Sequence, residues 1–348
     1  MRPLHRGKTF FLSLFLLARC RMAALDLVEV DDGYSISNDS GYSEPIYSTA
    51  SVRSSVFDYE VKHGRSYHAY HPDKYYMPND EGEQERLDLH YHALRLALED
   101  KITLAPINNP HGILDVGTGT GIWAMDAADA WPEAEVVGLD LSPIQPNWVP
   151  PNLQFEVADA DERWGFAQER FSLVHTRIMN GFGVSSWPHF YAEAFSCLKP
   201  GGWVENQEFD CTIVSDDGTL PENSKIAEWA RLWNQSVETI GKTGRCNPRK
   251  LVDQMEEAGF INTQVITKKM PIGPWPKDPM LKESGIFGLV ALYHGVYGMS
   301  VRLFKDVLGW SEEQLQVFLA EFRQELMKKS IHSYWPTCVI SIFRLEKH

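Results

Sequence analysis

The segment DVGTGTGIW, residues 115–123, places three glycines between an aspartate and a short apolar run. The residues GILDVG predict a short buried strand that leads into the glycines, and a helix is predicted from about Ile122 to Asp129. A glycine-rich turn between a strand and a helix lets a ligand come close to the backbone. In open α/β sheets, ligands bind beyond the carboxyl ends of the strands. The segment therefore predicts a ligand site, and the nature of that ligand decides the function.

The chain around this turn alternates predicted strands with predicted helices. Further strands are predicted at 135–141, 153–160, 171–177 and 203–209, with a helix at 187–198 that Pro200 ends. This alternation predicts an α/β fold with a mostly parallel sheet covered by helices on both faces. A helix capped by Asp80 and Glu83 precedes the sheet, and helices at 226–240, 248–258 and 312–329 and strands at 261–270 and 334–343 follow it. We expect one ordered domain over 57–348, with an N-terminal lid helix and cap elements around 210–310.

The composition disfavours nucleic acid as a partner. The 348-residue chain carries a net charge of −14, whereas phosphate backbones are bound largely through Lys and Arg. The five cysteines form no C-x-x-C pair, and their odd number suggests neither a disulfide framework nor a zinc knuckle. A reducing compartment is the simplest interpretation, so we expect the protein in the cytoplasm.

The first residues resemble a signal peptide, with a basic start and an apolar run from Phe10 to Ala18. This run is too short to span a bilayer, and no stable membrane insertion is expected. Met22 opens a plausible alternative start, so residues 1–56 are interpreted as a disordered or mis-assigned segment.

The glycine turn fits two nucleotide-type ligands. Gly119, Gly121 and Ala124 satisfy G-x-G-x-x-A, and Asp140 follows Gly119 by 21 residues (140 minus 119), which suits a dinucleotide. The alternative is the methyl donor S-adenosylmethionine, which is cationic and has no phosphate. The acid that precedes the turn, Asp115, would repel a diphosphate but can face a cationic amino group. A plain turn with core aspartates is disfavoured because unpaired carboxylates are costly to bury.

Acids at three successive strand ends favour the methyl donor. Asp140 ends the second predicted strand, where it can bind two ribose hydroxyls. Asp159 lies near the end of the third strand, where it can accept a hydrogen bond from an adenine amino group. Together with Asp115, these carboxylates suit a cationic nucleoside.

Several longer segments, taken together, resemble the fungal LaeA-like group of class I S-adenosylmethionine-dependent methyltransferases. These are ILDVGTGTGIWA, VVGLDLSPIQPNWVPPNLQFEVADA, LKPGGWVENQEF, the segment from GRSYHAYHPDKYY to LDLHYH and the closing LGWSEEQ to SYWP, within residues 60–345. The resemblance implies a Rossmann-like, seven-stranded, mostly parallel sheet with one antiparallel strand and a helical cap. It also implies a cofactor site at Asp115, Gly117, Thr118, Gly119, Gly121, Asp140, Leu141, Asp159 and Ala160. Members often carry an acid where this chain has Ser186, which leaves the fit of the acceptor open.

Methyl transfer depends mainly on alignment and exclusion of water, and an oxygen acceptor also gains from a base. His175, at the end of the fourth predicted strand, is the candidate base, although a packed histidine would give the same pattern. Arg177 and Asn180 are candidate substrate-binding residues. Glu205 and Glu208 are expected to be solvated or paired with a helix. No metal site is predicted, because His90 and His92 point to different sides of their helix.

Two kinds of function follow from this pattern. Aromatic residues of the cap, among them Trp229, Trp233 and Trp275, could line a pocket for a hydrophobic small molecule, although most of them could simply pack the cap. The sequence therefore predicts a methyltransferase acting on a small-molecule secondary metabolite. The alternative is a nuclear regulator of secondary-metabolite gene clusters that works with a protein partner.

Overall fold

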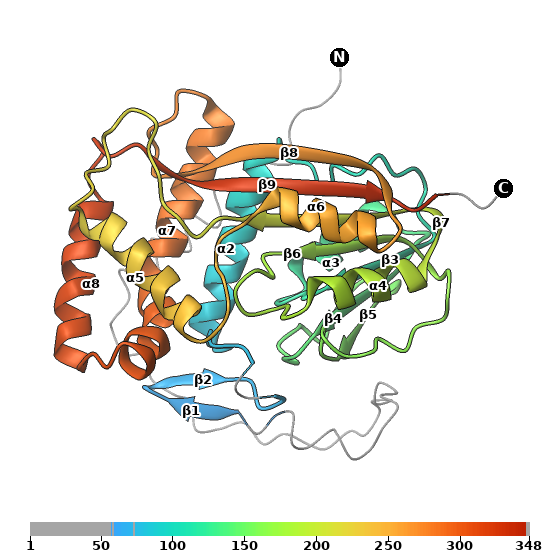
Figure 1. Cartoon of the computed structure of the whole chain (residues 1–348), viewed down its shortest axis with the longest axis horizontal. Helices are drawn as coiled ribbons and strands as arrows, with labels where there is room; N and C mark the ends of the chain where they lie inside the picture. Colours follow the sequence, from blue (N-terminus) through green and yellow to red (C-terminus); the bar gives the residue numbers. More distant parts are fainter. Residues whose placement is uncertain (1–56, 58, 72–73, 346–348) are drawn as a thin grey trace, which may run out of the picture. The chain divides into compact units, whose positions relative to one another are not determined.

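The computed structural model describes residues 57, 59–71 and 74–345. The segment 1–56, for which we expected disorder or a mis-assigned start, lies outside the described residues. In Figure 1 the described chain forms one sheet with helices packed against it and a group of further helices at one end of the sheet.

The sheet has seven strands in the order β5-β4-β3-β6-β7-β9-β8. Strands β3 to β7 are paired in parallel, and β9 is antiparallel to both of its neighbours, β7 and β8. The predicted α/β fold, with one antiparallel strand in a seven-stranded sheet, is therefore confirmed. The strands are β3 (Gly112–Val116), β4 (Glu135–Asp140), β5 (Leu153–Val157), β6 (Phe171–Arg177), β7 (Leu198–Phe209), β8 (Ile261–Ile272) and β9 (Ser333–Phe343).

Alternating side chains of the strands bury two opposite faces of the sheet, as the period of two requires. On one face, Leu114, Val137 and Val174 pack against α4 (Trp187–Cys197) and α6 (Pro248–Glu257). On the other face, Ile113 and Val136 pack against α3 (Ile122–Ala130). Layers of helices on both faces leave the carboxyl edge of the parallel strands as the place where a ligand can reach the backbone.

A third cluster of buried apolar residues forms the cap, next to the sheet. It joins α2 (Glu81–Ala97), α5 (Lys225–Thr239), α7 (Pro279–Arg302), the π-helical turn Leu303–Val307 and α8 (Glu312–Leu326). Figure 1 shows α5, α7 and α8 together at the end of the sheet that lies beside α2. A short hairpin, β1 (Glu60–Lys62) and β2 (Arg65–Tyr67), precedes α2.

The N-caps of α8 and α2 differ in one respect. Ser311 and Gln314 form a full capping box at α8. At α2, Asp80 accepts a hydrogen bond from the Glu83 backbone N–H, but the Glu83 side chain pairs with Arg86 instead of completing the box. The capping pattern therefore predicts where α2 begins, but the Glu83 carboxylate binds Arg86 and not the backbone of the N-cap residue.

Helix α7 is long and apolar enough to cross a membrane by length and composition, with a mean hydropathy of 1.3 over its most apolar window. Most of that window, 61%, is buried inside the protein, against α2 and β8. We therefore interpret α7 as a core helix of the cap.

Candidate functional site

A pocket opens at the carboxyl ends of β3, β4 and β6, where the glycine turn leaves the sheet. The empty space between its walls, counted together with the solvent open to it, is about 1340 Å³. Its walls come from the sheet, from the segment before α2, from α2 and from the cap. The predicted site residues that line it are Gly117, Thr118, Gly119, Asp140, Leu141, Ala160, Arg177 and Asn180.

The three glycines of the turn have different tasks, although all have positive φ (77°, 60° and 82°). A Cβ on Gly119 would lie no closer than 3.9 Å to any neighbour, so this residue borders open space. A Cβ on Gly117 would lie 2.2 Å from the Met179 sulfur, and one on Gly121 would lie 2.4 Å from Phe155 Cζ. Gly119 therefore gives a ligand access to the backbone, while the other two glycines allow the turn to pack.

Asp140 is the one acidic residue among the described residues that line the pocket. Its two oxygens accept hydrogen bonds from the backbone N–H groups of Gly119, at 2.8 Å, and Ser142, at 2.9 Å. A carboxylate has about four acceptor positions, so lone pairs are left for hydroxyl groups of a ligand. Burial raises the pKa of Asp140 to about 6, which leaves it mostly ionised at pH 7.

Asp115 and His175 lie behind the pocket wall and form a buried pair. His175 Nδ1 lies 2.8 Å from Asp115 Oδ1, and the imidazole stacks on Trp123 with ring centroids 3.6 Å apart. The other Asp115 oxygen accepts a hydrogen bond from the Thr118 hydroxyl at 2.7 Å. Neither residue lines the pocket. The geometry favours a structural role for the pair, since Asp115 links His175 to the Thr118 hydroxyl of the glycine turn. The roles of His175 as base and of Asp115 as cofactor ligand stay predictions.

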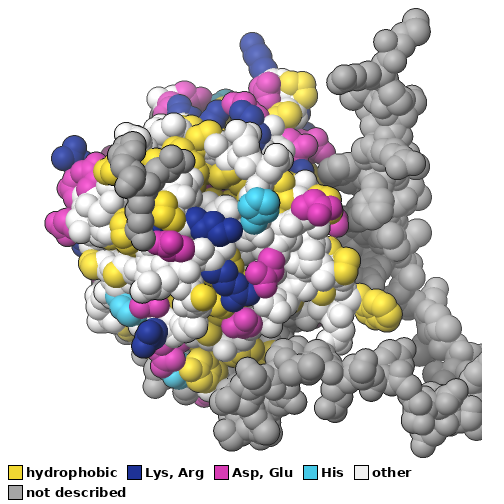
Figure 2. Space-filling view, turned by 90° about the vertical axis from the view of Figure 1, so that its right-hand side faces the viewer, with side chains coloured by type: hydrophobic (Ala, Val, Ile, Leu, Met, Phe, Trp, Pro, Cys, Tyr) yellow, Lys and Arg dark blue, Asp and Glu magenta, His cyan; other side chains and the backbone are white. Residues whose placement is uncertain are grey.

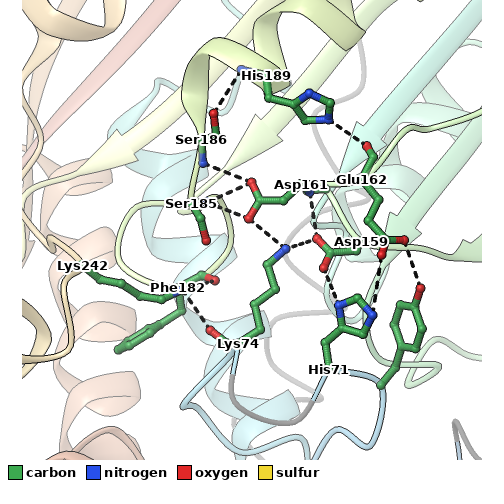
Figure 3. Close-up of polar contacts among 12 residues, drawn as sticks. His71, Lys74, Asp159, Asp161, Glu162, Phe182, Ser185, Ser186, His189 and Lys242 are labelled. Atoms are coloured by element: carbon green, nitrogen blue, oxygen red, sulfur yellow. Dashed lines mark hydrogen bonds and ion pairs between the residues drawn. The ribbon is translucent and has the colours of Figure 1, made fainter.

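Asp159 is also held by protein groups. Lys74 forms an ion pair with Asp159, and His71 Nδ1 lies 2.9 Å from the second Asp159 oxygen. Lys74 also lies 2.8 Å from Asp161, so its ammonium group points between the two carboxylates (Figure 3). Asp159 does not line the pocket, whereas the next residue, Ala160, does. Contact of Asp159 with an adenine amino group stays a prediction.

His71, Asp159 and Glu162 come close enough to hold a metal ion, since one possible ligand atom of each lies within 4.8 Å of the others. The Lys74 ammonium already neutralises Asp159 at this place. We assign no metal to the cluster, because a cation next to that ammonium would be repelled.

The segment before α2 forms the outer wall of the pocket, and we refer to residues 74–80 as the strap. Tyr75, Met77 and Asn79 of the strap line the pocket. Tyr76 stacks on Phe182 with ring centroids 5.7 Å apart, so the strap packs against the loop that follows β6. Arg86 of α2, the predicted lid helix, also lines the pocket and pairs with Glu83 at 2.8 Å.

The loop after β6 is held in an unusual conformation by a buried acid. Glu208 accepts hydrogen bonds from the backbone N–H groups of Met179, at 2.9 Å, and Asn180, at 3.3 Å. Between Arg177 and Met179, Ile178 has a φ of 55°, which is rare for a β-branched residue and costs about 1–3 kcal/mol. Backbone strain of this kind concentrates at functional sites, and here it lies in the pocket wall.

Glu205 and Glu208 correct a prediction, because both are buried instead of solvated. Glu205 accepts hydrogen bonds from the backbone N–H groups of Leu104 and Ala105 and from the Ser341 hydroxyl. Burial raises the pKa of Glu208 to about 8. Both acids fasten loops to the sheet.

Several pocket residues were missed from the sequence. His90 lines the pocket from α2, and burial lowers its pKa well below the usual value, so the imidazole is neutral. A polar residue three positions after Leu87 on an apolar helix face is a signal that could have identified it. Of the aromatic cap residues proposed from the sequence, Trp233 lines the pocket while Trp229 is packed in the cap.

The residues present fit an adenosyl ligand. Gly119 leaves backbone open to it, and Asp140 can accept hydrogen bonds from ribose hydroxyls. Four nitrogen atoms of pocket residues are buried without a hydrogen-bond partner among the described residues, which is typical of polar groups that a ligand satisfies. They are Asn79 Nδ2, His90 Nε2, Arg177 Nη1 and Asn180 Nδ2.

On the face shown in Figure 2, the Lys and Arg side chains are interspersed with acidic side chains. This face shows no broad basic surface of the kind that phosphate backbones need.

The chain is similar to known proteins over most of its length. Residues 89–265 match a family model described as a methyltransferase domain. Methyltransferase pytC of Aspergillus terreus is 42% identical over 318 residues, covering 90% of this chain and 94% of pytC. The secondary metabolism regulator laeA of Aspergillus fumigatus is 34% identical over 294 residues, covering 84% and 78% of the two chains.

Solved structures resemble the chain more distantly. A phosphoethanolamine N-methyltransferase of Haemonchus contortus, in complex with S-adenosylhomocysteine, shares 16% sequence identity at a TM-score of 0.43, with 74% of this chain and 53% of that one covered. The relatives at higher identity confirm the resemblance to the LaeA-like group that the sequence indicated.

Proposed function

The chain belongs to the methyltransferase family, whose methyl donor is S-adenosyl-L-methionine, and we propose that it methylates a small molecule of secondary metabolism. The observation that carries this proposal is the pocket at the glycine turn, with Gly119 open to a ligand and Asp140 able to accept hydroxyl hydrogen bonds. The name of pytC, a methyltransferase related over nearly its whole length, supports an enzyme of this kind.

The protein's contribution to the reaction is alignment and exclusion of water. When bound, S-adenosyl-L-methionine supplies a methyl group activated by a positively charged sulfur. Gly119, Asp140 and Leu141 would hold the adenosyl portion, because they line the pocket at the ends of β3 and β4. The strap and Phe182 form the outer wall of the pocket, which limits the entry of water and helps to hold the reactants in place. Such positioning can contribute about 7–11 kcal/mol to lowering the barrier.

The acceptor pocket combines apolar and hydrogen-bonding groups. Met77, Phe182 and Trp233 offer apolar contacts, and Asn180 offers an unpartnered amide. His90 lines the same space, and we propose that its unpartnered ring nitrogen hydrogen-bonds to the acceptor, while its lowered pKa disfavours it as a base.

Two measurements test the enzyme. Calorimetric titration of the purified protein with S-adenosylhomocysteine should give saturable binding to one site. Labelled S-adenosyl-L-methionine, mixed with extracts of producing cells, should then transfer label to a small organic product. Binding of NADH without any binding of S-adenosylhomocysteine would contradict the proposal.

A second candidate function is regulation of gene clusters, which the 34% identity to laeA favours. Deleting the gene and profiling transcripts and metabolites separates the two candidates. Loss of one methylated product supports the enzyme, whereas silencing of many clusters supports the regulator. For the enzyme we propose a cytoplasmic location, and the regulator would require a nuclear location and a protein partner.

A further inference from the structure

Positive charge and hydrogen-bond donors gather at one end of the pocket. Asp140 stands at the end of β4, whereas Arg177 ends β6 and Asn180 follows it in the next loop. In the sheet order, β3 with its glycine turn lies between β4 and β6. A ligand that lies across the turn with its ribose at Asp140 therefore has its other end at Arg177.

Arg177 is a cation without a compensating anion. Its Nη1 atom is shielded from solvent and has no hydrogen-bond partner among the described residues. None of the described acids forms an ion pair with it within 4.0 Å. Its guanidinium carbon lies 4.6 Å from the centre of the Tyr91 ring, which holds the group by a cation–π contact. Burial lowers the pKa of Arg177, and the charges of nearby acids such as Asp115 and Asp88 offset only part of this effect.

Arg86, on the same pocket wall, shows the contrast. Its guanidinium donates two hydrogen bonds to Glu83 Oε1, at 3.0 and 2.8 Å, so its charge is already neutralised within the protein. A buried charge with no partner is costly, and proteins retain one where a ligand supplies the opposite charge. The guanidinium fork matches the geometry of a carboxylate.

We propose that Arg177 binds the carboxylate of the methionyl portion of S-adenosyl-L-methionine and so fixes the donor at the end away from the ribose. The inference rests on the proposed function, since it assigns a residue to that same site. A carboxylate of an acidic acceptor has the same chemistry. The position of Arg177 next to the turn, one strand beyond β3, favours the donor.

The test compares two ligands that differ by one group, S-adenosyl-L-methionine and decarboxylated S-adenosylmethionine. Calorimetry measures the binding of each to the wild type, to Arg177→Met and to Arg177→Gln, with Arg170→Met as a matched control. Arg170 pairs with Glu135 outside the pocket. No acceptor is present, so any effect belongs to the donor and not to an acidic acceptor.

Loss of a charge-assisted hydrogen bond should lower the affinity of both Arg177 variants for the complete donor by about tenfold or more. Their affinity for the decarboxylated ligand should stay near that of the wild type, and Arg170→Met should bind both ligands normally. Equal losses for the two ligands, or no loss for either, would overturn the assignment. A wild type that binds neither ligand would instead refute the proposed function. Thermal unfolding checks that the variants are folded.

Discussion

At the scale of single residues, Glu208, which holds the loop after β6, makes the free energy of unfolding depend on pH. Its pKa is raised by burial to about 8, whereas a glutamate in the unfolded chain titrates near 4.5. Between these values the folded protein holds a proton that the unfolded chain has lost. The contribution of Glu208 to the free energy of unfolding is therefore greatest below pH 4.5 and falls as the pH rises towards 8.

We predict that Glu208→Gln removes this dependence. Urea unfolding of both proteins at pH 5, 6, 7 and 8 should show the wild type losing stability relative to the variant by up to about 1.4 kcal/mol per pH unit. The variant should be less stable at pH 5. Both oxygens of Glu208 accept hydrogen bonds from backbone N–H groups, and the glutamine side chain replaces one of these oxygens with an NH2 group, which cannot accept. A stability difference that is constant with pH would contradict the assignment of a raised pKa.

The glycine turn, Asp140, Arg177 and Asn180 could be located from the sequence because they directly end or follow a strand. Parallel strands bring such residues to one edge of a sheet. What could not be predicted is which acids the protein satisfies by itself. Asp159 and Asp115 occupy similar sequence positions to Asp140, but Asp159 forms an ion pair with Lys74 and Asp115 hydrogen-bonds to His175. These partners lie 85 and 60 residues away along the chain, and only the folded packing brings them together.

At the scale of elements, α7 approaches β8 so closely that glycine is required. A Cβ on Gly285 would lie 2.0 Å from the backbone oxygen of Gly273, and the Gly273 N–H donates a hydrogen bond to the Gly285 carbonyl at 2.8 Å. We predict that Gly285→Ala destabilises the protein by about 1–2 kcal/mol. Overpacking costs about 1–3 kcal/mol and alanine returns up to about 1 kcal/mol of helix propensity.

Gly82→Ala in α2 is the matched control for this prediction. Its Cβ would lie no closer than 3.5 Å to any neighbour, the nearest being Asp80 Oδ1, which is an ordinary contact. Chemical denaturation should therefore show Gly82→Ala to be close to the wild type. Equal stability of the two variants would contradict a backbone contact at Gly285.

The strands β3, β4 and β6 were predictable because each is a short, mostly apolar run followed by turn residues. The helix α7 was not predicted, although its sequence is strongly apolar. It is buried on several sides by α2 and β8, so its sequence lacks the polar face that marks a surface helix. The hairpin of β1 and β2 was missed for a different reason, since each strand has only three residues.

At the scale of the whole molecule, the order of strands and helices along the chain is enough to give the fold class. The same order does not reveal which residues line the pocket, because the walls of the pocket come from the sheet, the strap and the cap at once. Trp233 reaches the pocket from α5, Met299 from α7 and Tyr75 from the strap. No periodicity within one element indicates which of its residues meet another element at this place.

The strap joins the cap to the sheet, and Lys74 is its main tie to the sheet. The Lys74 side chain is 12% exposed, and its ammonium contacts Asp159 and Asp161, while Tyr76 lies against Arg302 of the cap. We predict that Lys74→Met frees the strap, because two acids then face each other without a cation. Hydrogen exchange measured by mass spectrometry should be about tenfold faster or more for residues 75–79.

The control Lys305→Met breaks the more exposed pair with Glu312 and should leave exchange in the strap unchanged. Unchanged exchange in Lys74→Met would mean that the aromatic contacts alone hold the strap.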